Sequence, residues 1–193
     1  MKRRDALKLL AASAALPLLS RDAFSLFRAV HEDLPASPAL HALDAHQNAT
    51  VTTISELIIP QTDTPGAKAA RVNEFIDVIL SDWFEDAERV SFLAGLADID
   101  THSQSLFGKD FVSASAAQQT ELLTELDEEV VRVRDSGRRH RGDPTKEEFF
   151  ASMKHLTLVG YYTSQIGFEQ ELRQQIISPT HSSCAALVPE TKK

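Results

Sequence analysis

The feature that most constrains the fold is a run of large apolar residues spaced as on one face of a helix. They recur at positions i, i+3, i+4, i+7, i+8 and i+11, and they are Val72, Phe75, Ile76, Ile79, Leu80 and Trp83. A period of about 3.6 residues predicts an amphipathic helix with one buried face. The residues expected on the opposite, solvent-facing side are Asn73, Glu74, Asp77 and Asp82.

Four further helices are predicted over residues 44–59, 86–106, 115–136 and 145–162. Pro60 ends the first and Gly108 follows the second as a C-cap, while Ser115 and Thr145 each open a capping box. The apolar residues expected inside the second of these helices are Val90, Leu93, Leu96 and Ile99. No stretch alternates with a period of two residues. The predicted fold class is therefore all-α, a small bundle of about five helices.

The first residues have the order of an export signal. The basic Lys2, Arg3 and Arg4 precede an uncharged apolar run over residues 9–19. That run is short, because a bilayer-spanning helix needs roughly 20 apolar residues. Arg3 and Arg4, followed by Leu7 and Lys8, resemble the twin-arginine export pattern, which implies a periplasmic location and passage through the twin-arginine translocase. The alternative is the start of an ordinary amphipathic helix.

We therefore divide the chain into a signal and linker over residues 1–30 and one helical domain over residues 31–193. The stretch 21–43 mixes prolines, serines and acids with apolar residues, and we expect a linker or a loosely held arm. Signal removal is expected between residues 14 and 30, or not at all, and the tail from Pro179 onward is expected to be irregular. The net charge of −8 argues against nucleic acid as a partner.

Motifs for a bound cofactor are missing from the sequence. It has no Gly-x-Gly-x-x-Gly, no Cys-x-x-Cys-His, no Glu-x-x-His and no Gly-x-Ser-x-Gly. We therefore expect no cofactor in this chain and no catalytic residue. The histidines are scattered, and only Asp98, Asp100 and His102 form a small polar cluster at a helix end, where a weak ion site is conceivable.

Two features remain open between a structural and an interaction role. Cys184 is the only cysteine, so in an oxidising compartment it is either a free thiol or the partner of a cysteine in another chain. The run Tyr161, Tyr162, Thr163 and Ser164 lies between two glycines at the end of an apolar helix. It either caps the core or forms a partner interface, where tyrosine is enriched.

Three stretches carry a family resemblance. They are Asp63-Thr64-Pro65-Gly66-Ala67 after Ile58-Ile59-Pro60, Phe92-Leu93-Ala94-Gly95-Leu96, and Thr157-Leu158-Val159-Gly160-Tyr161-Tyr162-Thr163-Ser164. With the twin-arginine start and the late cysteine, the chain resembles the gluconate 2-dehydrogenase subunit 3 family over about residues 50–185. It departs from the family at the tail, where Ser182, Ser183 and Ala185 replace the usual glycine and tyrosine beside the cysteine.

The resemblance implies a non-catalytic small (gamma) subunit of a membrane-associated, FAD-dependent sugar or sugar-acid dehydrogenase. It implies a catalytic flavoprotein of the glucose–methanol–choline type as partner, and a multihaem cytochrome with haem c as a possible third subunit. The small subunit would aid maturation of the flavoprotein and supply the export signal that the flavoprotein lacks, which would place the complex in the periplasm at the inner membrane. The alternative from another class is a stand-alone periplasmic helical binding protein, and a metal-dependent enzyme is disfavoured by the scattered ligands.

Overall fold

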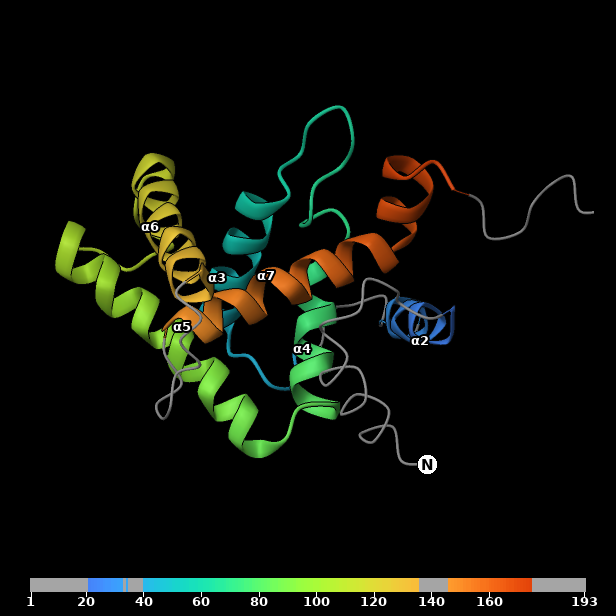
Figure 1. Ribbon diagram of the computed structural model, residues 1–193, viewed down its shortest axis with the longest axis horizontal. Helices are drawn as coiled ribbons and strands as arrows, with labels where there is room; N and C mark the ends of the chain where they lie inside the picture. Colours follow the sequence, from blue (N-terminus) through green and yellow to red (C-terminus); the bar gives the residue numbers. More distant parts are fainter. Residues whose placement is uncertain (1–20, 33, 35–39, 136–145, 175–193) are drawn as a thin grey trace, which may run out of the picture.

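A computed structural model describes residues 21–32, 34, 40–135 and 146–174. Helices without strands make up this described part, which confirms the all-α prediction (Figure 1). The helices are α2 (Arg21–Glu32), α3 (Ala45–Ile58), α4 (Val72–Asp82), α5 (Asp86–Phe107), α6 (Ala116–Asp135), α7 (Lys146–Thr163) and a π-helix, η1 (Ile166–Glu171). The five helices predicted from the sequence correspond to α3–α7.

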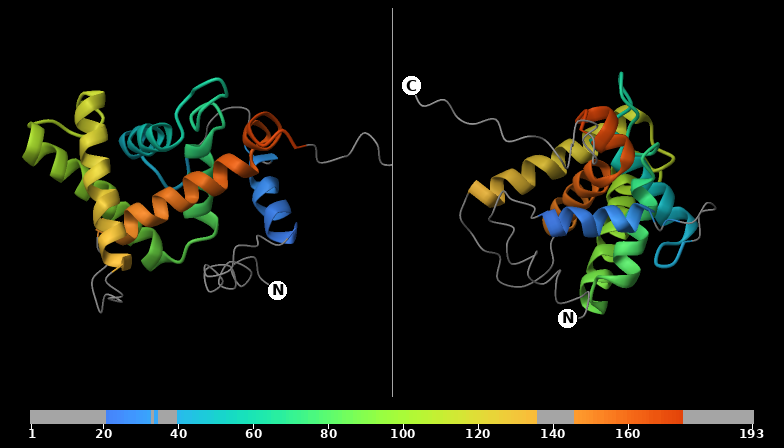
Figure 2. Two further views of the ribbon diagram at one scale, coloured as in Figure 1. Left: turned by 45° about the horizontal axis from the view of Figure 1, so that its top comes forward. Right: turned by 90° about the vertical axis from the view of Figure 1, so that its right-hand side faces the viewer.

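Helix α7 is the centre of the fold. It contacts α2, α3, α4, α5, α6 and η1. In Figure 1 it crosses the middle of the molecule, with α5 and α6 beside its beginning and α2 near its end; Figure 2 gives two further views of this arrangement. The core around it contains the fully buried Ile54, Phe75, Leu122, Met153 and Tyr161. Residues on α7 therefore couple elements that are far apart in the chain.

The apolar face predicted for α4 is confirmed, but one of its predicted solvent residues is buried. Asp77 is 1 % exposed. Its carboxylate accepts the backbone N–H groups of His41 (2.7 Å), Ala42 (3.0 Å) and Leu43 (2.8 Å). Placing Asp77 on the solvent face was wrong, because this carboxylate satisfies the donors of the chain segment that leads into α3.

The linker expected over residues 21–43 was also wrong in its first part, since residues 21–32 form helix α2. Phe27 and Val30 are buried. The Phe27 ring lies 6.1 Å from that of Phe75 and 6.4 Å from that of Trp83, measured between centroids. Burial of these two apolar side chains against α4 and α7 stabilises the helix.

Several helix ends are as predicted. Ser115 and Gln118 form the expected capping box, in which Gln118 N–H donates to Ser115 Oγ and Ser115 N–H donates to Gln118 Oε1. Gly108 is the left-handed C-cap of α5, with φ 69°. The predicted box at Thr145 lies outside the described residues.

The inward face of α5 differs from the prediction at its first position. Val90 is 65 % exposed, so its placement in the core was wrong. Leu96 and Ile99 are buried as predicted, and Phe92 and Ser103 are buried on the same face. They follow one another at i, i+4, i+7 and i+11, and this face leaves Val90 on the solvent side.

Candidate functional site

Two of the motif stretches singled out in the sequence meet in space. Tyr161, in α7, donates its hydroxyl to the carbonyl oxygen of Pro65 at 2.7 Å. Thr64 Oγ1 donates to a carboxylate oxygen of Glu171, in η1, at 2.6 Å. We call the meeting of the 60–71 loop with the end of α7 and η1 the motif junction, and it is the candidate functional site.

The loop side of the junction is held by one carboxylate. Glu56 accepts the backbone N–H of Gln61 at 3.0 Å and that of Lys68 at 2.8 Å, one with each oxygen. A Cβ atom on Gly66 would lie 2.5 Å from Glu56 Oε1 and 2.6 Å from the backbone nitrogen of Gln61. Glycine is therefore required because the loop closes directly over this carboxylate.

The helix side is held by a serine and a second glycine. Ser164 Oγ donates to the carbonyl of Tyr161 at 2.6 Å and accepts the N–H of Gly167 at 3.1 Å. A Cβ atom on Gly167 would lie 2.1 Å from that same carbonyl oxygen. The chain thus turns sharply from α7 into the π-helix, an element that is uncommon in proteins and often found at functional sites.

The predicted partner interface at Tyr161–Ser164 is mostly enclosed by the chain's own residues. Tyr161, Thr163 and Ser164 are buried, and Tyr162 is half-buried with its ring 5.3 Å from the Tyr161 ring. Burial raises the pKa of Tyr161, so this phenol stays protonated and donates. These geometries assign a core-capping role to Tyr161, Thr163 and Ser164; whether Tyr162 contacts a partner stays a prediction.

Next to the junction, α2 is joined to α7 by a neutral histidine. His31 Nε2 lies 2.5 Å from the carbonyl oxygen of Gly160, and its ring stacks on Phe75 at 4.9 Å. This carbonyl is free to accept because Ser164 N–H bonds to Tyr161 instead of continuing the helix. Burial, and then the charges of Arg71 and Arg28, lowers the pKa of His31 to about 4. Nε2 therefore carries the hydrogen of the neutral ring and donates a hydrogen bond to the carbonyl oxygen of Gly160.

A groove of about 370 Å³ lies beside His31. Residues from α2, from the 60–71 loop and from the end of α7 line it, among them Arg28, Arg71 and Ser164. Arg71 has left-handed backbone, with φ 56°, and forms a bidentate ion pair with Glu74. The groove thus brings two arginine side chains beside the His31 ring.

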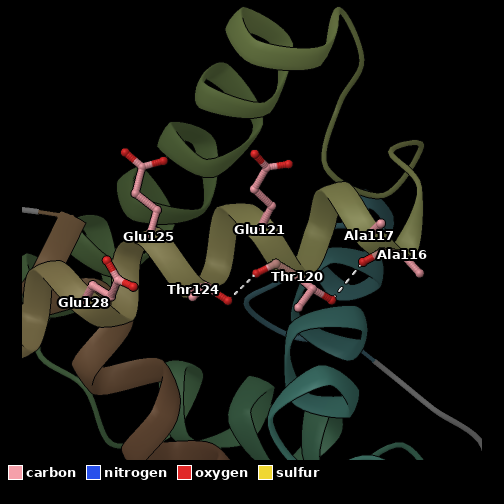
Figure 3. A pocket seen from close by; sticks show the side chains of 7 residues that line it. All are labelled: Ala116, Ala117, Thr120, Glu121, Thr124, Glu125 and Glu128. Carbon is pink, nitrogen blue, oxygen red and sulfur yellow. Dashed lines mark hydrogen bonds between the residues drawn. The ribbon is translucent and has the colours of Figure 1, made fainter.

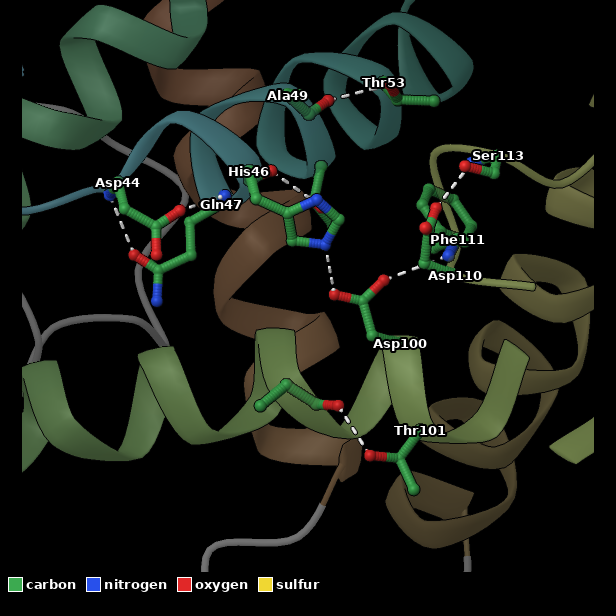
Figure 4. Close-up of polar contacts among 12 residues, drawn as sticks. Asp44, His46, Gln47, Ala49, Thr53, Asp100, Thr101, Asp110, Phe111 and Ser113 are labelled. Atoms are coloured by element: carbon green, nitrogen blue, oxygen red, sulfur yellow. Dashed lines mark hydrogen bonds and ion pairs between the residues drawn. The ribbon is translucent and has the colours of Figure 1, made fainter. Parts of the chain in front are cut away.

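The polar cluster predicted at Asp98, Asp100 and His102 is not brought together. Asp100 accepts from His46 Nε2 at 2.6 Å with one oxygen and from the N–H of Phe111 at 2.9 Å with the other (Figure 4). His102 faces Glu125 instead, at 3.6 Å. The hydrogen bond to Asp100 raises the pKa of His46. Across the described ranges, no group of three or more His, Cys, Asp and Glu side chains is arranged to hold a metal ion.

An open acidic groove runs along α6 (Figure 3). Its carboxylates belong to Glu121, Glu125 and Glu128. The hydroxyls of Thr120 and Thr124, on the same helix, donate to the carbonyls of Ala116 (2.8 Å) and Thr120 (2.7 Å). The hydroxyls are thus used within the helix, and the glutamates form a charged surface without a converging acid and base.

A comparison with known protein families identifies the family of this chain. The family described as gluconate 2-dehydrogenase subunit 3 matches residues 45–179. This chain belongs to the gluconate 2-dehydrogenase subunit 3 family. No curated protein and no solved structure matches it.

The family match covers α3 to η1, and so it includes both halves of the motif junction. In this member of the subunit 3 family, the three resembling stretches build the fold: the 63–67 turn holds Tyr161, and Gly95 lies against Phe149. The remaining predicted residues, Arg3, Arg4, Leu7, Lys8 and Cys184, lie outside the described residues. Where the structure describes helices, none is long and apolar enough to cross a membrane.

Sequence reasoning missed His31, Glu56 and Glu171. Their partners are Gly160, the Gln61 and Lys68 amides, and Thr64. Glu171 lies 107 residues from its partner in the sequence, and His31 lies 129 residues from its partner. No local sequence pattern covers such distances. The 63–67 turn and the stretch between Gly160 and Gly167 were the signals that this region has a defined conformation.

Proposed function

We propose that this chain is the non-catalytic small subunit of a periplasmic dehydrogenase. Its catalytic partner would be an FAD-dependent flavoprotein of the glucose–methanol–choline type that oxidises a sugar or sugar acid, with a multihaem cytochrome as a possible electron acceptor. The small subunit would aid maturation of that partner and its export by the twin-arginine translocase. FAD and haem c would be held by those other subunits.

The observation that carries the proposal is membership of a family of dehydrogenase subunits. The residues of the motif junction and of the neighbouring α2–α7 contact are consistent with a structural role. The Tyr161 hydroxyl, the Glu56 carboxylate and the His31 ring are each used in a hydrogen bond within the chain. A subunit with this arrangement contributes binding and positioning, and the redox chemistry belongs to the partner.

The escort role follows from combining this family with the N-terminal pattern. Flavin binds to a folded protein, so a flavin-loaded partner needs a route that accepts folded cargo. The twin-arginine route implied by Arg3 and Arg4 is of that kind. A single signal on the small subunit would then serve both chains.

The test is to produce the full chain alone and together with the flavoprotein, and to measure dye-linked sugar oxidation, bound flavin and co-purification. We expect activity and flavin in the complex and neither in the isolated chain. Flavin-linked activity of the isolated chain would contradict the accessory role. A flavoprotein that never co-purifies with the chain would contradict the partnership.

A further inference from the structure

The outer face of α7 differs from the other exposed surfaces of the molecule. Residues Ala151, His155, Leu158 and Tyr162 follow one another at i, i+4, i+7 and i+11, so they share one face of the helix. Ala151 and His155 are exposed, Leu158 is 43 % exposed, and Tyr162 is half-buried. We call this set the α7 stripe. It faces outward on α7, which contacts every other helix in the described part of the chain.

The stripe lies in an unusually uncharged part of an acidic chain. The 14 residues 155–168 contain no Asp, Glu, Lys or Arg. The net charge of the whole chain is −8. A solvent-facing helix surface ordinarily has charged residues, whereas the centre of a protein interface is depleted of charge and enriched in tyrosine.

Charged and polar pairs border the stripe at both ends. Lys154 pairs with Asp127 of α6 at 2.6 Å near its beginning. Gln165 donates to Glu169 at 2.9 Å near its end. An apolar centre with a polar rim is the usual composition of a protein–protein interface.

We infer that the α7 stripe docks the catalytic flavoprotein subunit, through an uncharged, mainly apolar surface of that subunit with a hydrogen-bond acceptor for the Tyr162 hydroxyl. This inference rests on the proposed function. The proposed function names the partner, and the absence of charged residues from the stripe favours an uncharged surface on that partner. A charged surface would be desolvated here without a counter-charge. Tyrosine contributes a large contact area with one polar end, as hot-spot residues do.

Val90 is an exposed apolar side chain in a charged setting, and it supplies a matched control. Val90 is 65 % exposed on α5. Its direct neighbour is Arg89, which pairs with Asp86 at 2.7 Å. Single exposed apolar residues among charges are ordinary on protein surfaces. Val90→Glu and Leu158→Glu each replace one exposed aliphatic side chain by a glutamate. The two variants therefore introduce the same charge at different places on the surface.

The experiment co-expresses the flavoprotein with the wild-type full chain, with Leu158→Glu or with Val90→Glu, and measures the co-purified flavoprotein. Circular dichroism of each isolated chain checks the fold. We expect at least a tenfold loss of flavoprotein with Leu158→Glu and no loss with Val90→Glu. If the wild-type chain binds and Leu158→Glu binds equally, the docking assignment is wrong while the proposed function stands. If the wild-type chain itself binds no flavoprotein, the proposed function fails.

Carbene footprinting of the wild-type full chain, alone and in the complex, gives a second measurement. We expect labelling of Leu158 and Tyr162 to fall severalfold in the complex. The buried Met153 gives the reference for a covered side chain. If Leu158 and Tyr162 are labelled as weakly as Met153 in the isolated monomer, the chain covers its own stripe. That result would overturn the inference. A dimer of the isolated chain that Leu158→Glu separates would overturn it too, because a second copy would then be the occupant.

Discussion

The hydroxyl of Tyr161 donates to the carbonyl of Pro65 across 96 residues of sequence, at 2.7 Å. This bond joins the end of the central helix α7 to the turn that follows α3. It shows that two of the stretches that resemble the family are parts of one structural unit. Their shared occurrence in the sequence therefore has a physical cause in the fold.

Tyr161→Phe tests this bond. It removes the donor and leaves the Pro65 carbonyl without its partner. We expect the free energy of unfolding to fall by about 1–2 kcal/mol, the usual cost of leaving an inward-facing acceptor unsatisfied. Urea unfolding followed by circular dichroism measures it. The half-buried neighbour gives the control, Tyr162→Phe, for which we expect a smaller change; equal stability of Tyr161→Phe and wild type would show that the bond contributes nothing.

Gly95→Ala tests the contact between α5 and α7. A Cβ atom at position 95 would lie 2.2 Å from Cγ of Phe149. Overpacking of this kind costs about 1–3 kcal/mol, against up to about 1 kcal/mol that alanine gains over glycine within a helix. We therefore expect net destabilisation in thermal unfolding. The double variant Gly95→Ala with Phe149→Leu should recover part of the loss, and a single variant more stable than wild type would refute the contact.

The His31–Gly160 bond predicts a loss of stability in acid. The pKa of His31 is lowered from 6.5 to about 4 in the folded chain, so the unfolded chain takes up a proton at a pH where the folded chain does not. The stability contributed by neutral His31 is present above pH 6.5 and is lost as the pH falls toward 4. His31→Gln keeps an N–H donor but does not titrate. We expect its unfolding free energy to fall less steeply than that of wild type between pH 6.5 and 4.

A second histidine gives the control for this slope. The pKa of His46 is raised by its hydrogen bond to Asp100, so its contribution is present below pH 6.5 and is lost as the pH rises through the raised pKa. His46→Gln should therefore leave the slope between pH 6.5 and 4 as in wild type. His155 has a lowered pKa as well, and the difference between wild type and His31→Gln isolates the share of His31. Parallel curves for these two proteins would exclude His31 as a source of the acid sensitivity.

Cys184 provides a prediction about assembly. We expect it to form a disulfide with the catalytic subunit, because a lone cysteine in an oxidising compartment has no partner within its own chain. Non-reducing gels of the complex, with thiols blocked during lysis, should show one covalent band that Cys184→Ser abolishes. Separate bands for the wild-type complex without reductant would end this idea.

Features that depend on neighbouring residues in the chain were predicted correctly. They are the apolar period of α4, the capping box at Ser115 and the C-cap at Gly108. The role of Asp77 was missed because periodicity places a polar residue outside unless its partners are known. Its partners are the backbone donors of residues 41–43, which the pattern of side chains cannot reveal.

The candidate site was predicted in part, for the same reason. The 63–67 turn and the Gly160–Gly167 stretch were recognised as special, but composition left Tyr161 open between core and interface. Tyr161 is buried in the fold, and a partner contact of this stretch stays a prediction. Helix α2 was missed although Phe24, Phe27 and Val30 recur every three residues, because the stretch 21–43 was interpreted as a whole from its prolines, serines and acids. Its docking on α4 and α7 adds long-range contacts that no local pattern shows. Such long-range contacts are decided by the whole fold and not by the local sequence.

The most direct test of the escort role is the location of the flavoprotein in cells that produce the wild-type chain, the double variant Arg3→Lys with Arg4→Lys, or no small subunit. Cell fractionation followed by flavin and activity assays measures the periplasmic share. We predict flavin-loaded flavoprotein in the periplasm with the wild-type chain, and its retention in the cytoplasm with the double variant and without the subunit. An equal periplasmic share in all three strains would contradict the account.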